Sequence, residues 1–117
     1  MSTQDKDISI YFKHIKDSCN RIGRFIRGVS YSKLLGDELI QNAVIRQLEV
    51  IGEATRQIPQ EVRAKYKQVN WDDIVGMRDK LVHDYIGVDL EVVWKASTTD
   101  VPILRKLILK ILKEDFI

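Results

Sequence analysis

The segment from Gly76 to Gly87 holds three side chains whose types suit RNA chemistry. Arg78 carries a permanent charge and can bind a phosphate through two parallel hydrogen bonds. His83 titrates near neutral pH and can move a proton, and Tyr85 adds a phenol two residues later. When RNA is cleaved without a metal ion, a base deprotonates a 2′-hydroxyl, which attacks the adjacent phosphate while a cation stabilises the developing charge. Arg78 and His83 are therefore the candidate catalytic residues.

The spacing of these residues limits what one helix can do. Along a continuous helix Arg78 and Tyr85 lie almost on one line, whereas Arg78 and His83 differ by about 140° around the axis. Arg78 and His83 would converge if the helix ended near His83, or if a two-fold axis placed the same segment of a second subunit opposite. Otherwise His83 is a helix-end histidine bonded to a carbonyl, and Tyr85 is an ordinary half-buried tyrosine.

Further polar residues are candidates for a supporting role. On the helix expected before this segment, polar residues recur at steps of four, three and four, so that Arg46 and Glu53 share one side. They either meet the segment across the bundle or form a charge network within their own helix. Asp84, next to His83, either orients the histidine or faces solvent.

Apolar residues at steps of three and four predict an all-α fold, an antiparallel bundle of four to five helices. The first helix is expected over about residues 7–29, followed by a turn-like stretch over 28–33. Asp37 can cap the second helix, which Pro59 should end. A short helix suits residues 59–67, because proline is tolerated at the first helical position.

The second half of the chain repeats the same start signal. Asn70 is expected to cap a helix that ends before Gly87, and Asp89 to cap the last helix. The apolar phase of that last helix continues across Pro102, which favours one helix kinked at the proline over two helices. Clean alternation over four or more residues, the sign of a strand, is absent. The surplus apolar surface suggests a homodimer.

Composition narrows the class of protein. The 117 residues suit a single domain, 1–117, with a net charge of +2 and a pI near 8.7, which permits a nucleic-acid partner without demanding one. Two local clusters of basic residues are either nucleic-acid contacts or ordinary solvated helix faces. The clusters are Arg21, Arg24 and Arg27, and Arg63, Lys65 and Lys67.

Several residues are expected to have structural roles. Cys19 continues an apolar helical stripe and should be a core residue, and the scattered histidines and single cysteine make a poor zinc set. His14 should lie on the surface, and Trp71 and Trp94 should anchor the core or an interface. No signal peptide or membrane span is apparent, so a cytoplasmic protein with no membrane partner is expected.

The motif and its surroundings resemble a known family. Arg78-x-x-x-x-His83-x-Tyr85 resembles the signature of the HEPN superfamily, and three flanking blocks resemble its HepT branch. The similarity extends over about residues 7–112. The blocks are NAVIRQLEVIGEA at 42–54, Trp71 with IVGMR at 74–78, and GVDLEVVW at 87–94.

The resemblance implies a homodimeric toxin of a type VII-like toxin-antitoxin pair. Such toxins are metal-independent endoribonucleases that need no cofactor, with the motif arginine and histidine of both subunits lining a cleft at the dimer axis. Arg78 would hold the scissile phosphate and His83 would act as general base or acid. The cognate antitoxin would be an MNT-type nucleotidyltransferase that transfers AMP from ATP to Tyr85, which would also be a possible RNA contact.

Two other functions remain open on the sequence. The chain could be a catalytically silent HEPN module that binds the nucleotidyltransferase and serves as its substrate or adaptor. It could also be a scaffold dimer without nucleotide chemistry, in which case changing Arg78 or His83 would affect stability alone. The RNA target and the stoichiometry with the antitoxin do not follow from the residues.

Overall fold

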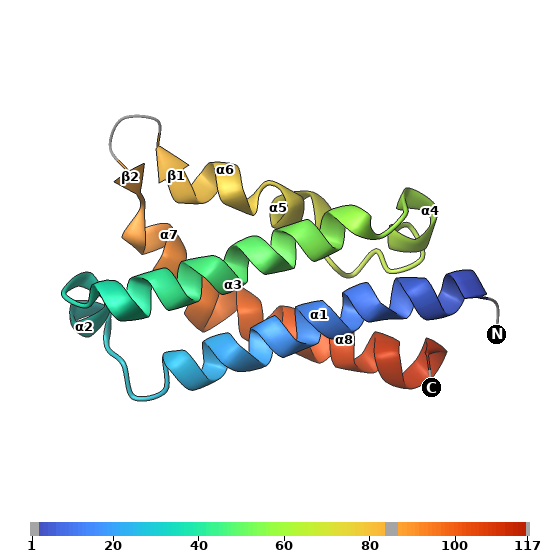
Figure 1. The fold of residues 1–117 in the computed structure, drawn as a ribbon, viewed down its shortest axis with the longest axis horizontal. Coiled ribbons are helices and arrows are strands. Elements are labelled where there is room, and N and C mark those ends of the chain that lie inside the picture. Colours follow the sequence, from blue (N-terminus) through green and yellow to red (C-terminus); the bar gives the residue numbers. More distant parts are fainter. Residues whose placement is uncertain (1–2, 84–86, 117) are drawn as a thin grey trace.

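The computed structural model describes the backbone of residues 3–83 and 87–116, and the side chains of 8–81 and 87–116. The described chain is mostly helical, as the apolar periodicity predicted. The three long helices are α1 (Thr3–Phe25), α3 (Glu38–Gln57) and α8 (Val101–Asp115). α1 packs along its apolar stripe against both α3 and α8 (Figure 1).

The apolar stripe of α1 forms the centre of the core. Phe12, Ile15 and Ile22 are fully buried, which confirms the predicted face of this helix. Phe12 packs edge-on against Trp71, with 6.2 Å between ring centroids. The helix ends at Phe25 instead of continuing to residue 29, because the next residues form a turn.

Side-chain caps start the next two helices. In the stretch expected to be only a turn, Ser30 accepts a 3.1 Å hydrogen bond from the amide of Lys33 and starts a short helix, α2 (Tyr31–Leu35). Asp37 accepts a 3.1 Å hydrogen bond from the amide of Ile40 and caps α3, as predicted. Both contacts satisfy amides that have no partner inside the helix.

The segment after α3 has shorter helices than the sequence indicated. Only α4 (Gln60–Arg63) forms in the stretch predicted as a helix over 59–67. The Trp71 indole donates to the carbonyls of Arg63 and Tyr66, at 3.0 and 3.1 Å. These bonds close the loop over the buried Trp71 ring, which confirms its predicted anchoring role.

The prediction of a single helix that begins at Asn70 and ends before Gly87 is wrong. The segment is divided at Gly76 into α5 (Trp71–Val75) and α6 (Met77–Leu81). The Asn70 side chain does not cap α5; its amide donates instead to the carboxylate of Asp73 three residues later.

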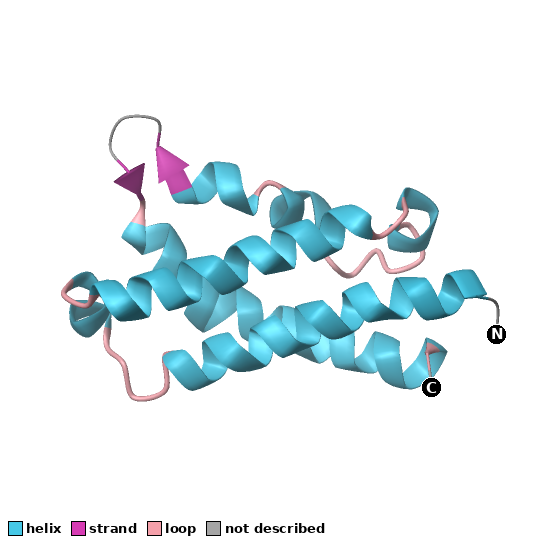
Figure 2. Cartoon of the chain, in the orientation of Figure 1, coloured by secondary structure: helices cyan, strands magenta, loops and turns pink. Residues whose placement is uncertain are grey.

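A two-stranded antiparallel hairpin follows α6, formed by β1 (Val82–His83) and β2 (Gly87–Val88). Figure 2 shows it as the only magenta in the drawn part of the chain. Two residues a strand are too few to leave an alternating pattern, so the sequence could not reveal the hairpin. The amide of Asp89 donates 2.8 Å to the carbonyl of Leu81, which ties the end of the hairpin to the end of α6.

Residues 90–115 form one continuous helical path, the alternative that the apolar periodicity favours, but its turn before Pro102 is π-helical and therefore wider than an α-helical turn. α7 (Leu90–Lys95) starts at Asp89, whose carboxylate caps it as predicted, and leads into a π-helical turn, η1 (Ala96–Asp100). The Val101 amide bonds the carbonyl of Ala96, five residues back. Because proline has no amide hydrogen and crowds the preceding turn, a wider turn at this position keeps the helix continuous.

The buried apolar side chains of all the long helices form one cluster. Trp94 is half-buried at its edge, where it packs on Tyr31 with 5.7 Å between ring centroids. No helix in the described ranges is long and apolar enough to cross a membrane.

Candidate functional site

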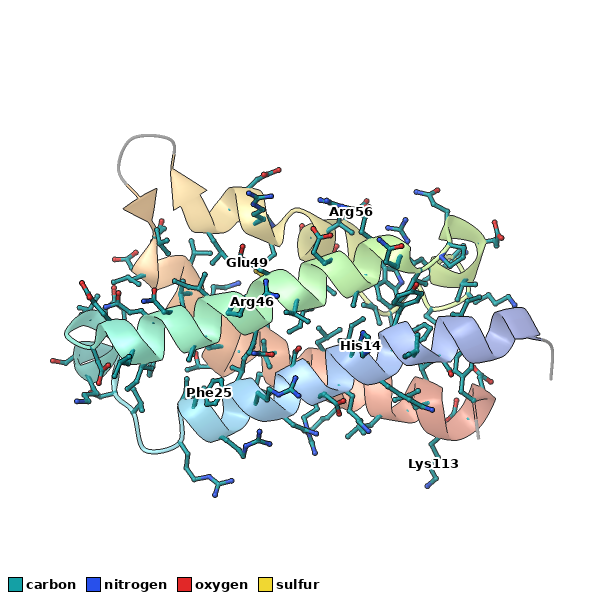
Figure 3. All side chains as sticks on the ribbon, viewed as in Figure 1. His14, Phe25, Arg46, Glu49, Arg56 and Lys113 are labelled. Atoms are coloured by element: carbon teal, nitrogen blue, oxygen red, sulfur yellow. The ribbon has the colours of Figure 1, made fainter. Side chains whose placement is uncertain are left out.

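A cleft of about 250 Å³ lies between the middle of α3 and α6. Figure 3 shows three of its charged residues, Arg46, Glu49 and Arg56, spaced along α3. Arg78 of α6 lies across from them. The full lining consists of Arg46, Leu48, Glu49, Gly52, Glu53 and Arg56 of α3, Val75 of α5 and Arg78 of α6.

Local packing turns Arg78 toward this cleft. Its neighbours Met77 and Leu81, four residues apart, are buried against the core, so α6 has one apolar face. Arg78 is exposed on the side of α6 that lines the cleft. Gly52 also lines the cleft, and a Cβ at this position would be in van der Waals contact with the carbonyl oxygen of Ile74, at 3.4 Å.

Charge in the cleft is mixed, with three arginines and two glutamates among its lining residues. Glu53 and Arg56 form an ion pair, with 3.3 Å between Oε1 and Nη1. Among the residues that the structure describes, Arg78 has no hydrogen bond or ion pair to a side chain. Its guanidinium therefore has donors available for an anion such as a phosphate.

The chain leaves helical geometry between Arg78 and His83. α6 ends at Leu81, and His83 is the second residue of β1, paired with Gly87 of β2. The angle of about 140° expected on a continuous helix therefore does not apply. The side chain of His83, and Asp84 and Tyr85 altogether, lie outside the described residues.

Comparison with known proteins identifies the family. A family model described as ribonuclease HepT-like matches residues 15–111, most of the chain. The chain belongs to the HepT-like family. The matched range includes Arg46, Glu53 and Arg78 of the cleft and the whole motif through Tyr85.

Relatives of this HepT-like chain are named as ribonucleases. A protein of Caldanaerobacter subterraneus named "Putative RNase" is 36% identical over 105 residues, 90% of this chain and 94% of the relative. A protein of Thermococcus cleftensis named "Probable ribonuclease HepT" is 39% identical over 95 residues, 81% of this chain and 86% of the relative. A search of the solved structures returned no significant match.

The cleft of the HepT-like chain contains two charged residues that sequence reasoning did not select as site residues. These are Glu49, which belongs to the same polar stripe of α3 as Arg46 and Glu53, and Arg56. Arg56 follows Glu49 by seven residues and Glu53 by three, so helical periodicity alone could have placed it on the same side. Arg46 and Glu53 line the same cleft as Arg78, and Glu53 also pairs with Arg56 within its own helix.

Other reactive side chains of the HepT-like chain lie away from the cleft. Burial raises the pKa of the Cys19 thiol to about 12, with a smaller opposing effect from Arg105, so Cys19 is a neutral core residue, as predicted. His14 is exposed on α1, as predicted. Within the described part of the chain, no group of three or more His, Cys, Asp or Glu side chains could hold a metal ion.

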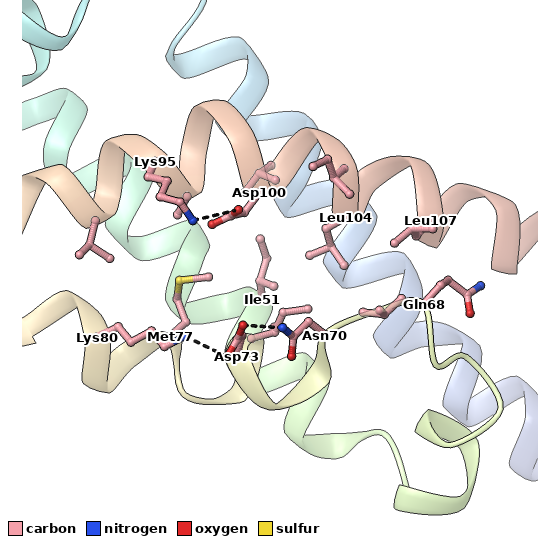
Figure 4. Close-up of a pocket in the computed structure, with 16 residues that line it drawn as sticks. Ile51, Gln68, Asn70, Asp73, Met77, Lys80, Lys95, Asp100, Leu104 and Leu107 are labelled. Carbon is pink, nitrogen blue, oxygen red and sulfur yellow. Dashed lines mark hydrogen bonds and ion pairs between the residues drawn. The ribbon is translucent and has the colours of Figure 1, made fainter.

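A larger cavity, of about 380 Å³, lies on the other side of α6 between α5, η1 and α8 (Figure 4). Its floor is apolar, with Ile51 and Leu104 among the lining residues. The charges at its edge pair with one another, Lys80 with Asp73 at 3.0 Å and Lys95 with Asp100 at 3.6 Å. Neither Arg78 nor Arg46 lines this cavity.

Proposed function

We propose that this chain is a metal-independent endoribonuclease, the toxin of a type VII-like toxin-antitoxin pair, with a composite site formed by two subunits. The observation that supports it most is the cleft between α3 and α6, in which the motif residue Arg78 lies near Arg46 with its guanidinium available. Membership of the HepT-like family and the names of the relatives agree with ribonuclease activity.

The proposed reaction needs only side chains of the protein. Arg78 binds the scissile phosphate through two parallel hydrogen bonds, and Arg46 adds positive charge beside it. His83 removes the proton of the 2′-hydroxyl, whose oxygen attacks the phosphorus while the bond to the 5′-oxygen breaks. A protonated histidine then returns a proton to that leaving oxygen, so the products are a 2′,3′-cyclic phosphate and a 5′-hydroxyl.

We propose that the two subunits meet at the end of the bundle that carries the hairpin. α2 and the start of α3 lie at the same end as β1 and β2 in Figure 1. Leu39 has 82% of its surface exposed, and Leu35 and Val88 are also exposed there, at 47% and 37%. Covering these side chains would favour dimerisation and bring the two motif segments together around a two-fold axis.

The dimer can be tested by its size in solution. Leu39→Glu places a charge in the proposed contact without changing the core of a monomer, because Leu39 is largely exposed. We expect a monomer by sedimentation and loss of RNA cleavage. Ile103→Glu, at another exposed apolar residue on α8, is the matched control and should leave the dimer intact. A Leu39→Glu protein that remains dimeric would place the contact elsewhere.

Neutralisation by AMP transfer to Tyr85 follows from the family resemblance. An MNT-type nucleotidyltransferase would join the α-phosphorus of ATP to the phenol oxygen, which loses its proton, while the bond to the β-phosphate breaks and pyrophosphate leaves. The added group would bring bulk and negative charge near Arg78 and compete with the RNA phosphate. Incubation with the cognate transferase and ATP should increase the mass by one AMP, and Tyr85→Phe should abolish this increase. An AMP found on another residue would contradict the assignment.

Expression of the chain alone tests the ribonuclease proposal. Wild type should arrest growth and fragment RNA, whereas Arg78→Ala and His83→Ala, at matched soluble levels, should not. Lys80→Ala is the control, since this exposed cation lies two residues from Arg78 but lines the other cavity and should behave as wild type. Purified protein should cleave RNA equally well in EDTA. Intact RNA in every culture would instead favour the silent module that serves the nucleotidyltransferase.

A further inference from the structure

A basic hollow lies between the end of α1 and the first half of α8. The hollow, of about 370 Å³, is lined by Cys19, Asn20, Gly23, Arg24, Arg27 and Arg105. α1 lies on one side of α3 and α6 on the other (Figure 1), so this hollow is separate from the cleft of Arg78. Arg24 of α1, Arg27 of the turn that follows it and Arg105 of α8 line the hollow, and no acidic residue is among the lining residues.

One hydrogen bond orients Arg105 at the hollow without neutralising its charge. The Nε of Arg105 donates to Oδ1 of Asn20, which positions the guanidinium of Arg105 against α1. Over the described ranges, no carboxylate lies within ion-pair distance of Arg24, Arg27 or Arg105. The floor carries no charge either, because the Cys19 thiol is buried and neutral. The three guanidinium groups therefore keep their charge and most of their donors.

This arrangement matches a chain of phosphates better than a protein surface. Protein interfaces have an apolar, desolvated centre, and the hollow has arginine, asparagine and glycine at its accessible edge. The strongly exposed leucines, Leu35 and Leu39, lie on α2 and α3 instead. Phosphates of RNA accept two parallel hydrogen bonds from each guanidinium and repeat at intervals that several arginines can follow.

We propose that the hollow formed by Arg24, Arg27 and Arg105 binds the phosphate backbone of the RNA substrate away from the cleavage site. This inference rests on the proposed ribonuclease function. The hollow adds affinity for long RNA and contributes nothing to the chemical step. It also explains the recurrence of arginine every three residues near the end of α1, to which α8 adds Arg105.

Binding can be measured with a 2′-O-methyl RNA of about 20 nucleotides, longer than the roughly 4 to 16 nucleotides that one single-strand site covers. This RNA has no free 2′-hydroxyl and resists the proposed cleavage. The dissociation constant is measured by fluorescence anisotropy at several salt concentrations. Arg24→Gln/Arg27→Gln should weaken binding and reduce the slope of log K against log salt by about 1.4, which is 0.7 for each lost phosphate contact.

A substitution at Gly23 tests the hollow without removing an arginine. A Cβ at Gly23 would meet no atom within 4 Å, so a side chain can leave the backbone at this exposed position without a clash. Gly23→Glu should weaken RNA binding because it adds a carboxylate beside the arginines. Gly23→Gln has nearly the same shape and helix propensity without the charge and should bind as wild type. Thermal unfolding of both variants excludes a loss of folding as the cause.

A control variant and a kinetic measurement complete the test. Lys110→Gln/Lys113→Gln removes two exposed cations near the other end of α8 and should not change the salt slope. On ordinary RNA, the arginine double variant should raise KM for long substrates and leave kcat unchanged. The inference would be overturned if the arginine double variant and Gly23→Glu both bound RNA as tightly as wild type. It would also be overturned if these variants kept their affinity for RNA but lost binding to a partner protein. If wild type binds RNA through the hollow but cleaves none, the ribonuclease proposal fails and the hollow stands.

Discussion

His83 lies directly opposite Gly87 in the antiparallel pair of β1 and β2, and Gly87 has a φ of +92°. Residues with a side chain rarely adopt this conformation, so the hairpin that carries the candidate catalytic histidine depends on a glycine four residues later. Because residue 83 pairs in this hairpin, α6 ends at Leu81. On a longer helix, His83 would lie about 140° around the axis from Arg78.

Gly87→Ala should therefore strongly reduce the rate of RNA cleavage while it only slightly lowers the free energy of unfolding. A side chain in the left-handed region costs about 1 to 2 kcal/mol, which the two-residue ladder can relieve by shifting His83. We expect a strong loss of cleavage rate with a small loss in the free energy of unfolding, measured by urea titration of the same protein. Gly28→Ala, at a glycine with a φ of +72°, is the matched control for backbone strain. Equal cleavage by both variants would show that the hairpin does not position His83.

Glu53→Gln should increase the affinity of the cleft for RNA. The substitution removes a negative charge and releases Arg56 from its ion pair with Glu53. Because both side chains are more than half exposed, the lost pair should cost no more than about 1 kcal/mol of stability. Binding of uncleavable RNA measures the effect, with Glu61→Gln on α4 as the control. Weaker binding or lost cleavage would instead indicate that Glu53 supports the catalytic residues directly.

Tyr66→Phe should destabilise the fold and flatten its response to alkaline pH. The phenol donates a 2.6 Å hydrogen bond to Oδ2 of Asp115 near the end of α8. Burial, and then the carboxylate of Asp115, raise the pKa of Tyr66. The loss of stability should be about 1 kcal/mol, as for a single hydrogen bond, and Asp115→Asn, which keeps an acceptor, should lose less.

The sign of the pH effect follows from the raised pKa of Tyr66. The folded protein holds the phenol proton more tightly than the unfolded chain, so this contribution is complete below the ordinary pKa of about 10 and decreases as the pH rises above it. Urea unfolding at neutral and alkaline pH should show a larger loss for wild type than for Tyr66→Phe. An equal loss in the two proteins would contradict this role.

Cys19 should be unreactive in the folded protein. Its side chain has 1% of its surface exposed, and a pKa of about 12 leaves almost no thiolate at pH 8. A disulfide reagent such as DTNB should react only at the rate of unfolding in native buffer, and at once in concentrated urea. Rapid reaction of the native protein would show that the hollow above Cys19 opens readily.

Local features of this chain could be inferred from the sequence because they depend on neighbouring residues. The buried stripe of α1 follows from apolar residues at helical spacing, and the caps at Asp37 and Asp89 bond amides two to three residues away. Asn70 is the exception, because its side-chain amide donates to the carboxylate of Asp73 and its side chain accepts no bond from a backbone amide of the helix. The motif of Arg78, His83 and Tyr85 could be recognised from the spacing of these residues and from the three blocks that flank it.

Contacts between distant segments required the tertiary structure. Periodicity placed Arg46 and Glu53 on one side of α3, but only packing decided that α6 and Arg78 lie across from that side. The hairpin at His83 depends on pairing with residues 87 and 88 and on the bond from the Asp89 amide to the Leu81 carbonyl, which short-range propensity does not encode. Arg24 and Arg105 share a hollow although 81 positions separate them, because the packing of α1 on α8 brings their helices together.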